Sequence, residues 1–341
     1  MIERGLIAVA LNEPTPAAMR AALRAAASVA DVVELRIDLL DDPEAASLPD
    51  LLAGRPRPVI VTCRAVREGG RWPGGEARRL DVLREAIALG VEYVDVEADA
   101  FDQVRERGRS RLIASSHDFT SMPADVPARW RALADTGADV VKIVGMAHDA
   151  RDVAPIVQAL ADADRPTIAI AMGEAGLASR VLALREPACL LTFCALETGG
   201  GTAPGQIGAA EMVSVYGARS LSRATAVVGL VGPGADDAAQ RRWNGLLRGA
   251  GHDAVAVPIV VPDPDGLADV LDALRPLELV GYVVAEPYQE IVGQVADGLE
   301  QSACRVGRVN LLRAQGDGLL ADWADEVPEA VSLLVGAAAH R

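Results

Sequence analysis

Residues 140–172 read V-V-K-I-V-G-M-A-H-D-A-R-D-V-A-P-I-V-Q-A-L-A-D-A-D-R-P-T-I-A-I-A-M. Two apolar runs of strand length, Val140–Met146 and Thr167–Met172, flank a segment of helical period, Val153–Ala161. Strands that alternate with helices in this way are typical of α/β folds. The stretch therefore predicts one strand–helix–strand unit.

The same alternation continues through about the first 220 residues. Further apolar runs are Leu6–Leu11, Val32–Asp38, Val59–Arg64, Tyr93–Asp99, Arg111–Asp118 and Leu190–Leu196, and further helical segments include Ala17–Ala30, Ala77–Leu89 and Pro127–Thr136. Eight strand–helix alternations with no switch in pattern predict a closed (β/α)₈ TIM barrel. An open doubly wound sheet is the alternative.

The pattern restarts near Leu221–Thr225, which predicts two domains, residues 1–222 and residues 223–341. The second segment opens with another apolar strand and continues with alternating helices and strands, at Ala226–Val231, Asp237–Gly249, Ala254–Val260, Leu267–Leu274 and Leu279–Ala285. We therefore expect a smaller α/β domain that follows the barrel in the sequence.

Composition excludes several classes of function. The formal net charge of −15 argues against binding to a phosphate backbone, and 3% aromatic residues are too few for base stacking. No apolar run reaches the ~18 residues of a membrane span, and no signal-peptide pattern is present. The four cysteines contain no C-x-x-C pair and indicate reduced thiols in a cytoplasmic protein: Cys63, Cys189, Cys194 and Cys304.

Of 33 basic residues, 32 are arginine, and Lys142 is the single lysine. It lies inside the apolar run V-V-K-I-V. A desolvated lysine can lose its proton and attack a carbonyl, whereas arginine keeps its charge. Lys142 is therefore a candidate nucleophile, and an ordinary salt bridge is the alternative.

Active sites of (β/α)₈ barrels lie at the carboxyl ends of the strands. Polar residues collect at these ends: Glu34, Arg36, Asp38, Arg64, Glu68, Asp95, Glu97, Asp99, His117, Asp118, Lys142 and Arg180. Singly, each could be part of a polar barrel floor or a solvated loop, and His117 could be satisfied by Asp118. Jointly, a lysine and a histidine on adjacent strands among arginines and carboxylates indicate an imine-forming site for a small anionic keto compound.

In order and spacing, the motifs E-L-R-I-D (34–38), T-C-R-x-x-x-E-G-G (62–70), D-V-E (95–97), S-x-H-D-F (115–119), V-K-I (141–143), A-M-G-x-x-G-x-x-S-R (171–180) and A-P-G-Q-I (203–207) resemble type I 3-dehydroquinate dehydratase. The resemblance implies a (β/α)₈ barrel with no metal and no organic cofactor, and commonly a homodimer. The reaction implied is the dehydration of 3-dehydroquinate to 3-dehydroshikimate in the shikimate pathway, which supplies aromatic amino acids.

The resemblance also implies roles for particular residues. Lys142 would form a Schiff base with the C3 ketone, and His117 would act as general base and then general acid, oriented by Glu68 and Asp95. Arg180 would clamp the substrate carboxylate. The other substrate contacts implied are Glu34, Arg36, Arg64, Met172, Thr202 and Gln206. Thr202 stands where the family usually has serine, and Met172 we expect to serve mainly in core packing.

The second segment resembles the N-terminal, substrate-binding domain of shikimate dehydrogenase, through V-V-G-L-V-G-P (227–233), W-N-G-L-L (243–247), D-A-V-A-V-P-I (253–259), V-G-Y-V-V-A-E-P (280–287), G-R-V-N (307–310) and Asp322. Its departures fall on the chemistry, because the serine motif is absent and Val283, Ala285 and Gln289 replace the family's Asn, Thr and Lys. The remaining chain is also too short for a nicotinamide-binding half. We therefore expect no shikimate dehydrogenase activity.

Two other functions stay open for the barrel. A Schiff-base aldolase on the same fold also needs a lysine on the sixth strand, and a non-catalytic protein could use the site to sense a metabolite. The G-L-V-G-P-G stretch at 229–234 has the wrong spacing for a dinucleotide-binding loop.

Overall fold

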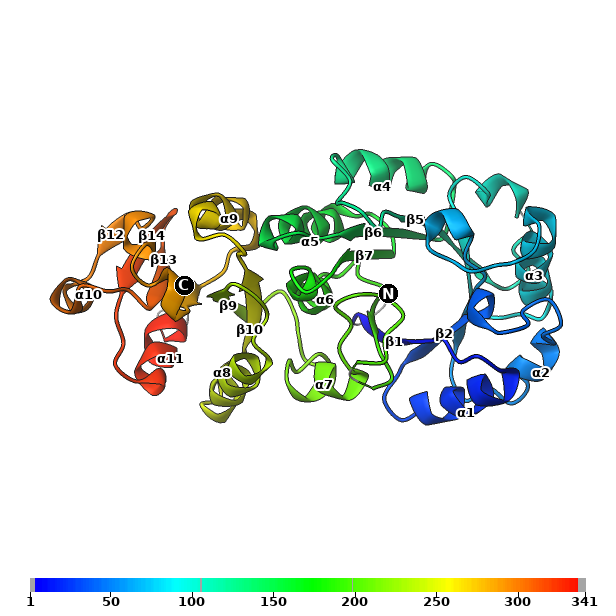
Figure 1. Ribbon diagram of the computed structural model, residues 1–341, viewed down its shortest axis with the longest axis horizontal. Coiled ribbons are helices and arrows are strands. Elements are labelled where there is room, and N and C mark those ends of the chain that lie inside the picture. The colour runs from blue at the N-terminus through cyan, green and yellow to red at the C-terminus, as the bar shows by residue number, and fades with distance from the viewer. Residues whose placement is uncertain (1–3, 105, 198, 337–341) are drawn as a thin grey trace.

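The structure is a computed structural model that describes residues 4–104, 106–197 and 199–336. Its first sheet has eight parallel strands in the order β7-β6-β5-β4-β3-β2-β1-β8. They are β1 (Leu6–Leu11), β2 (Val32–Arg36), β3 (Val59–Thr62), β4 (Tyr93–Glu97), β5 (Arg111–His117), β6 (Val140–Met146), β7 (Thr167–Met172) and β8 (Leu191–Cys194). Backbone hydrogen bonds of Thr167 with Ala188 and Leu190 join the start of β7 to the approach to β8. The sheet is therefore a nearly closed barrel, as predicted (Figure 1).

Seven helices of the described residues accompany the barrel: α1 (Pro16–Ala26), α2 (Leu48–Leu52), α3 (Glu76–Ala88), α4 (Val126–Ala134), α5 (Val153–Asp162), α6 (Leu177–Leu182) and α7 (Ala209–Ser214). The four predicted helices form, with ends that differ from the expected ones by at most four residues. The strict alternation breaks between β4 and β5, where the described residues contain only a 3₁₀ turn, Phe101–Gln103. Strands two to five and eight also end one to two residues earlier than the apolar pattern predicted.

Successive residues of each barrel strand belong to two different cores. One set packs between the sheet and the helices, for example Val141 and Ile143 of β6. The other set fills the barrel interior, for example Val140 and Val144 of the same strand. Because side chains alternate with period two, Lys142 shares the inner face with Val140 and Val144.

A second sheet has six strands in the order β10-β9-β11-β13-β14-β12. They are β9 (Ala226–Gly232), β10 (Ala254–Val260), β11 (Gly281–Val284), β12 (Gly298–Leu299), β13 (Leu311–Gln315) and β14 (Gly318–Asp322), and the helices of this part are α8 (Asp237–Gly249), α9 (Leu267–Ala273), α10 (Gln301–Val306) and α11 (Val327–Val335). β13 runs antiparallel to β11 and β14, and the other pairs are parallel. The elements up to β11 match the expected ones, whereas those after residue 285 were not predicted. We call residues 226–335 the second unit.

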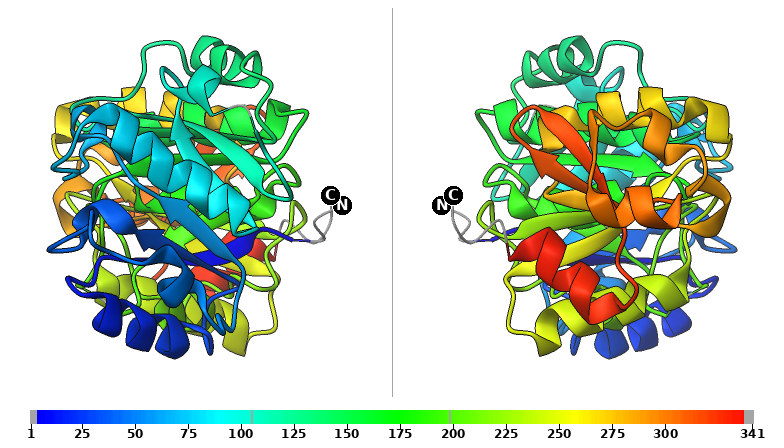
Figure 2. Two further views of the ribbon diagram at one scale, coloured as in Figure 1. Left: turned by 90° about the vertical axis from the view of Figure 1, so that its right-hand side faces the viewer. Right: turned by 90° about the vertical axis from the view of Figure 1, so that its left-hand side faces the viewer.

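The second unit packs directly on the barrel (Figures 1 and 2). β10 is an edge strand, yet it is buried from Val255 to Val260, because both α8 and the barrel helix α6 pack against it. All six residues of α6 are buried in turn. Tyr216, which follows α7, donates a hydrogen bond to the side-chain oxygen Oε1 of Gln240 on α8. The helix that carries Arg180 is thus held between the barrel and the second unit.

None of the helices within the described ranges is long and apolar enough to cross a bilayer.

Candidate active site

The polar strand ends of the barrel point into its interior because of the two-residue period of each strand. On β5, Ile113, Ser115 and His117 share the inner face, and on β4 Tyr93, Asp95 and Glu97 do so. The apolar member of each set lies deepest, and the polar members follow toward the carboxyl end. A polar cluster therefore rests on an apolar floor, where charges are costly unless they are paired.

Lys142 lies at the centre of this cluster and is only 4% exposed. Its Nζ donates to Asp95 Oδ2 at 2.8 Å and lies 3.5 Å from Glu34 Oε1. The ammonium also lies 4.5 Å from the centre of the Phe193 ring, a distance at which the ring face attracts a cation. Lys142 thus forms a salt bridge with Asp95, as the alternative interpretation of this residue required. It also lines a cavity, which a purely structural salt bridge would not require.

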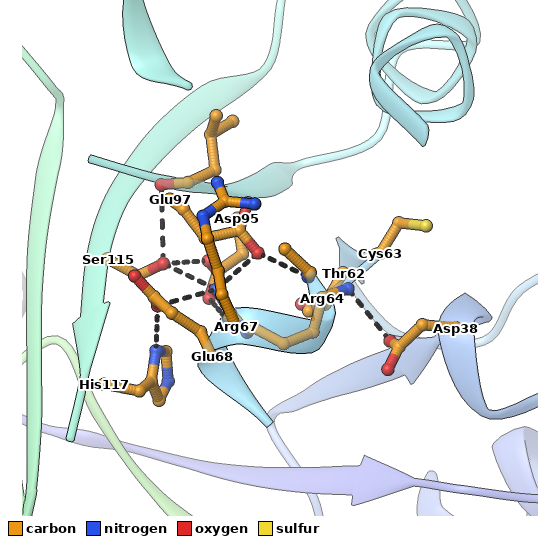
Figure 3. A network of polar contacts seen from close by, with 12 residues as sticks. Asp38, Thr62, Cys63, Arg64, Arg67, Glu68, Asp95, Glu97, Ser115 and His117 are labelled. Carbon is orange, nitrogen blue, oxygen red and sulfur yellow. Dashed lines mark hydrogen bonds and ion pairs between the residues drawn. The ribbon is translucent and has the colours of Figure 1, made fainter. Parts of the chain in front are cut away.

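The Arg64 guanidinium binds two carboxylates of this cluster and a hydroxyl between them (Figure 3). It binds Asp95 at 2.8 Å, Glu97 at 3.2 Å and the Ser115 hydroxyl at 2.7 Å. The Ser115 hydroxyl donates in turn to Asp95 at 2.6 Å. Although burial opposes ionisation, the Arg64 and Lys142 cations hold the pKa of Asp95 well below its usual range. Asp95 is therefore a fixed negative charge beside Lys142.

His117 is paired with Glu68 rather than with Asp118. Its Nδ1 lies 2.9 Å from Glu68 Oε2, whereas Asp118 accepts hydrogen bonds from Thr120 and Ser121. Burial raises the pKa of Glu68 to about 7. Burial and the nearby Arg64 and Lys142 cations lower the pKa of His117 well below its usual value. Both shifts favour an uncharged imidazole beside Glu68.

Arg180 is a buried cation with no carboxylate partner among the described residues. It is 1% exposed, its two terminal nitrogens donate to the Phe193 and Pro204 carbonyls, both at 3.2 Å, and its Nε has no partner. Burial alone lowers the pKa of Arg180 to about 10. An incoming carboxylate would supply the missing negative charge.

The loop after β8 covers this region through close backbone packing. The Gly173 amide donates to the Pro204 carbonyl, and a Cβ at Gly205 would meet the Gly173 carbonyl oxygen at 2.1 Å. The Gln206 side chain accepts from the Thr202 amide at 2.7 Å, which orders the loop from within. Gly205 also has a φ of +71°, so no other residue fits there easily.

Ten of the eleven residues predicted from the sequence line one cavity of about 270 Å³: Glu34, Arg36, Arg64, Glu68, His117, Lys142, Met172, Arg180, Thr202 and Gln206. Asp95 lies behind them against Lys142. Arg36 is held by both oxygens of Asp38, at 2.9 and 2.7 Å.

Several neighbours of this cavity were given no role from the sequence, although Glu97, Ser115 and Phe119 lie in its motifs. Asn12, Arg71, Phe119 and Phe193 line it, and Ser115 and Glu97 lie behind it. Asn12 follows β1 and Phe193 lies on β8, so their positions at strand ends were an available signal. Arg79, which lies on α3 and not at a strand end, gave no such signal.

In the second unit, the residues that match shikimate dehydrogenase, and Gln289, which departs from it, form hydrogen bonds within that unit. The Asn244 side chain exchanges two hydrogen bonds with Ala256 of β10, both at 2.9 Å. Asn310 exchanges two with Ala324, and Gln289 donates to the Val284 carbonyl. Asp322 is bound by Arg313 and Ser302. These side chains therefore hold the second unit together.

No group of three or more His, Cys, Asp or Glu side chains in the described ranges is arranged to hold a metal ion. What the cavity offers is a buried lysine, a histidine–carboxylate pair and an arginine that lacks an acidic partner among the described residues. A (β/α)₈ barrel with these groups belongs to the class of barrel enzymes equipped to form an imine with a small carboxylate.

The chain belongs to the type I 3-dehydroquinase family, whose family model matches residues 7–223. A 3-dehydroquinate dehydratase of Desulfotalea psychrophila is 35% identical over 223 residues, which cover 62% of this chain and 96% of that protein. The crystal structure of a type I 3-dehydroquinate dehydratase from Clostridium difficile superposes with a TM-score of 0.54 and 25% identity, over 62% of this chain and 90% of the other.

A longer relative extends past the barrel. The bifunctional 3-dehydroquinate dehydratase/shikimate dehydrogenase of Arabidopsis thaliana is 31% identical over 316 residues, which cover 89% of this chain. The chain spans about half the length of that relative, 52%. The dehydroquinate dehydratase and shikimate dehydrogenase structure from S. pombe shares the fold over 94% of this chain, with a TM-score of 0.52.

Proposed function

We propose that this chain is a 3-dehydroquinate dehydratase, which converts 3-dehydroquinate to 3-dehydroshikimate through an imine on Lys142. The observation that carries the proposal is that Lys142 and the His117–Glu68 pair line one cavity together with Arg180, a buried cation with no carboxylate partner among the described residues. The family and the D. psychrophila relative, matched over nearly its whole length, support the same reaction.

In the proposed reaction the Lys142 ammonium gives up a proton and its amine adds to the C3 ketone. The same proton then goes to the former ketone oxygen, which leaves as water, so that a protonated imine remains. His117 removes a proton from C2, and the electron pair moves to the iminium nitrogen as an enamine. The enamine then expels the C1 hydroxyl, which leaves as water after taking the proton back from His117. Hydrolysis of the remaining imine releases the enone and Lys142, so one water is lost overall.

The position of Glu68 selects the useful form of His117. When Glu68 is ionised it accepts the proton on Nδ1, so the lone pair on Nε2 is free to act as the base. Arg180 is proposed to hold the substrate carboxylate. Arg36 and Glu34 are proposed to contact ring hydroxyls, and Arg64, with its guanidinium already committed to Asp95 and Glu97, serves the charge network.

A borohydride trap tests the proposal. The protein is incubated with 3-dehydroquinate and reduced, and the mass of the peptide that contains Lys142 is measured together with the absorbance of the product enone. An adduct with enone formation supports the dehydratase. An adduct without enone favours a Schiff-base aldolase, and binding with neither signal favours a metabolite sensor.

The Glu68–His117 pair predicts how activity depends on pH. Because the pair is active only when Glu68 is ionised and His117 is neutral, kcat/KM should fall about tenfold per pH unit below about pH 7. Glu68→Gln should lower the plateau by at least about tenfold, since glutamine can stabilise the wrong histidine tautomer. It should also shift the acid limb of the pH profile, the range in which kcat/KM falls toward low pH, to lower pH, because the site then lacks the Glu68 carboxylate. An unchanged limb in Glu68→Gln, measured between pH 5 and 9, would contradict this assignment.

We further propose domains at residues 1–222 and 223–341, the second without shikimate dehydrogenase activity. Its support is that Asn310, Asp322 and Gln289 are committed to internal hydrogen bonds and that no lysine is present in the second segment. The expected result is no NADP-dependent oxidation of shikimate by the protein under conditions where dehydratase turnover is measured. Oxidation at a comparable rate would refute it. The homodimer and the cytoplasmic location stay predictions.

A further inference from the structure

Arg79 places a positive charge behind the catalytic cluster, outside the cavity itself. It lies on α3, a helix that packs against β3 and β4, and its side chain is only 1% exposed. Neighbouring positions on α3, Leu80 and Leu83, are apolar core residues. A buried guanidinium costs several kcal/mol unless it is well paired, so its partners explain its presence.

Those partners join the outside of the barrel to its catalytic interior. Arg79 Nε and Nη2 bind the two oxygens of Glu76, at 2.9 and 2.6 Å, at the half-exposed start of α3. Its Nη1 donates to Glu97 Oε2 at 2.7 Å and to the Cys63 carbonyl at 2.6 Å. Arg67 also lies 3.7 Å from Glu76, and it pairs with Asp99 at the surface.

Glu97 is shared between Arg79 and the catalytic cluster. Its other oxygen, Oε1, accepts from Arg64 Nη1 at 3.2 Å and from the Ala65 amide at 2.9 Å. Arg64 in turn binds Asp95 and lies 3.8 Å from Glu68. Charges of opposite sign therefore alternate without a break from the surface to the nucleophile: Glu76, Arg79, Glu97, Arg64, Asp95 and Lys142.

We propose that Arg79 is a positioning residue for the dehydration. By neutralising Glu97 it keeps Arg64 paired with Asp95 and Glu68, and it thereby sets the pH range in which His117 is active. The proposal rests on the proposed function for its kinetic test. Without Arg79, the wholly buried Glu97 would be left with Arg64 as its single cationic partner among the described residues, and Arg64 would be drawn away from Asp95 and Glu68.

The charged side chains that face His117 determine the direction of the shift in the pH profile. They are Glu68 from the loop after β3, Arg64 from the end of β3, Arg36 from β2, Asp95 from β4 and Lys142 from β6. Removing the positive charge of Arg79 makes the electrostatic potential at His117 and Glu68 more negative. A more negative potential favours protonation of the His117–Glu68 pair. The acid limb of kcat/KM should therefore move to higher pH.

The test compares Arg79→Met and Arg79→Lys with the unaltered protein. In Arg79→Met we expect the acid limb to rise by about half a unit to one pH unit, so that kcat/KM at pH 6 falls a further ~3- to 10-fold. Arg79→Lys keeps the positive charge, so the acid limb of kcat/KM should stay at its original pH. Arg84→Met, at an exposed arginine on the same helix that pairs with Asp81, is the matched control and should leave the profile unchanged.

A charge-balanced double variant guards against a folding defect. Arg79→Met with Glu97→Gln removes both charges, so the limb should return toward its original pH while the buried guanidinium is still absent. If the double variant shifts as far as the single one, or if the folded single variant keeps the original limb, the electrostatic role is wrong.

A measurement without substrate separates this proposal from the function on which it rests. The chain has four histidines, so the ring carbon–proton NMR signal of His117, which reports on protonation of the His117–Glu68 pair, can be followed with pH in each variant. Its midpoint should rise in Arg79→Met and stay in place in Arg79→Lys. Absence of dehydratase turnover would overturn the proposed function alone, whereas an unmoved midpoint would overturn the role of Arg79.

Discussion

Lys142→Met should reduce turnover of 3-dehydroquinate by about 10⁴-fold or more and abolish the borohydride adduct, because no other amine side chain is present in the sequence to form the imine. Methionine nearly matches the volume of lysine, so the apolar floor around Val140 and Val144 should stay packed. Asp95 keeps Arg64 as its partner in this variant.

Thermal unfolding of Lys142→Met checks that the barrel is intact, and Lys142→Arg provides the matched variant that keeps the positive charge beside Asp95. Both should be inactive, since arginine supplies charge but no nucleophile. Turnover within tenfold of the unaltered protein in either variant would rule out imine catalysis at this position.

His117→Asn should lower kcat by about 10²- to 10⁴-fold, the usual contribution of a general acid–base group. An asparagine amide can still donate to Glu68, so the variant removes Nε2 while keeping the partner of the carboxylate. Because the imine forms on Lys142 before C2 loses its proton, the borohydride adduct should persist and accumulate.

His148→Asn is the control for this substitution, since His148 lies on the surface and binds the Thr120 carbonyl. It should leave kcat and the adduct unchanged. A His117→Asn protein that turns over normally would assign proton transfer to another group of the cavity. Loss of the adduct together with turnover would indicate that His117 acts at imine formation instead.

Much of the site was predictable because strand periodicity and barrel geometry act together. Once Val140–Met146 is assigned as a strand, Lys142 must share a face with Val140 and Val144, and barrel closure brings all strand ends to one rim. Glu34, His117 and Lys142 could therefore be grouped from local patterns and family motifs. The same reasoning could not find Ser115 or Glu97 as partners of Arg64, because hydrogen bonds between strands depend on rotamers and register.

The second unit was predictable only in its first half. Its long apolar strands, such as Ala226–Val231, gave the same signal as those of the barrel. After residue 285 the elements are short, and β12 has only two residues, so their hydrophobic pattern carries little information. Their place in the sheet is set by pairing between strands, of β13 with β11, β14 with β13 and β12 with β14, and by packing of α11 on β13, which no local stretch encodes.

By itself, the sequence determined the (β/α)₈ barrel, the single lysine as candidate nucleophile and the family, since each depends on local periodicity, composition or ordered motifs. Only the tertiary structure decided that Ser115 and Glu97 bind Arg64, that Arg180 lacks an acidic partner among the described residues, and that Arg79 reaches Glu97 from an outer helix. The physical reason is that electrostatic partnership depends on distance and burial in space, and charges far apart in the chain are brought within hydrogen-bonding reach only when the barrel closes.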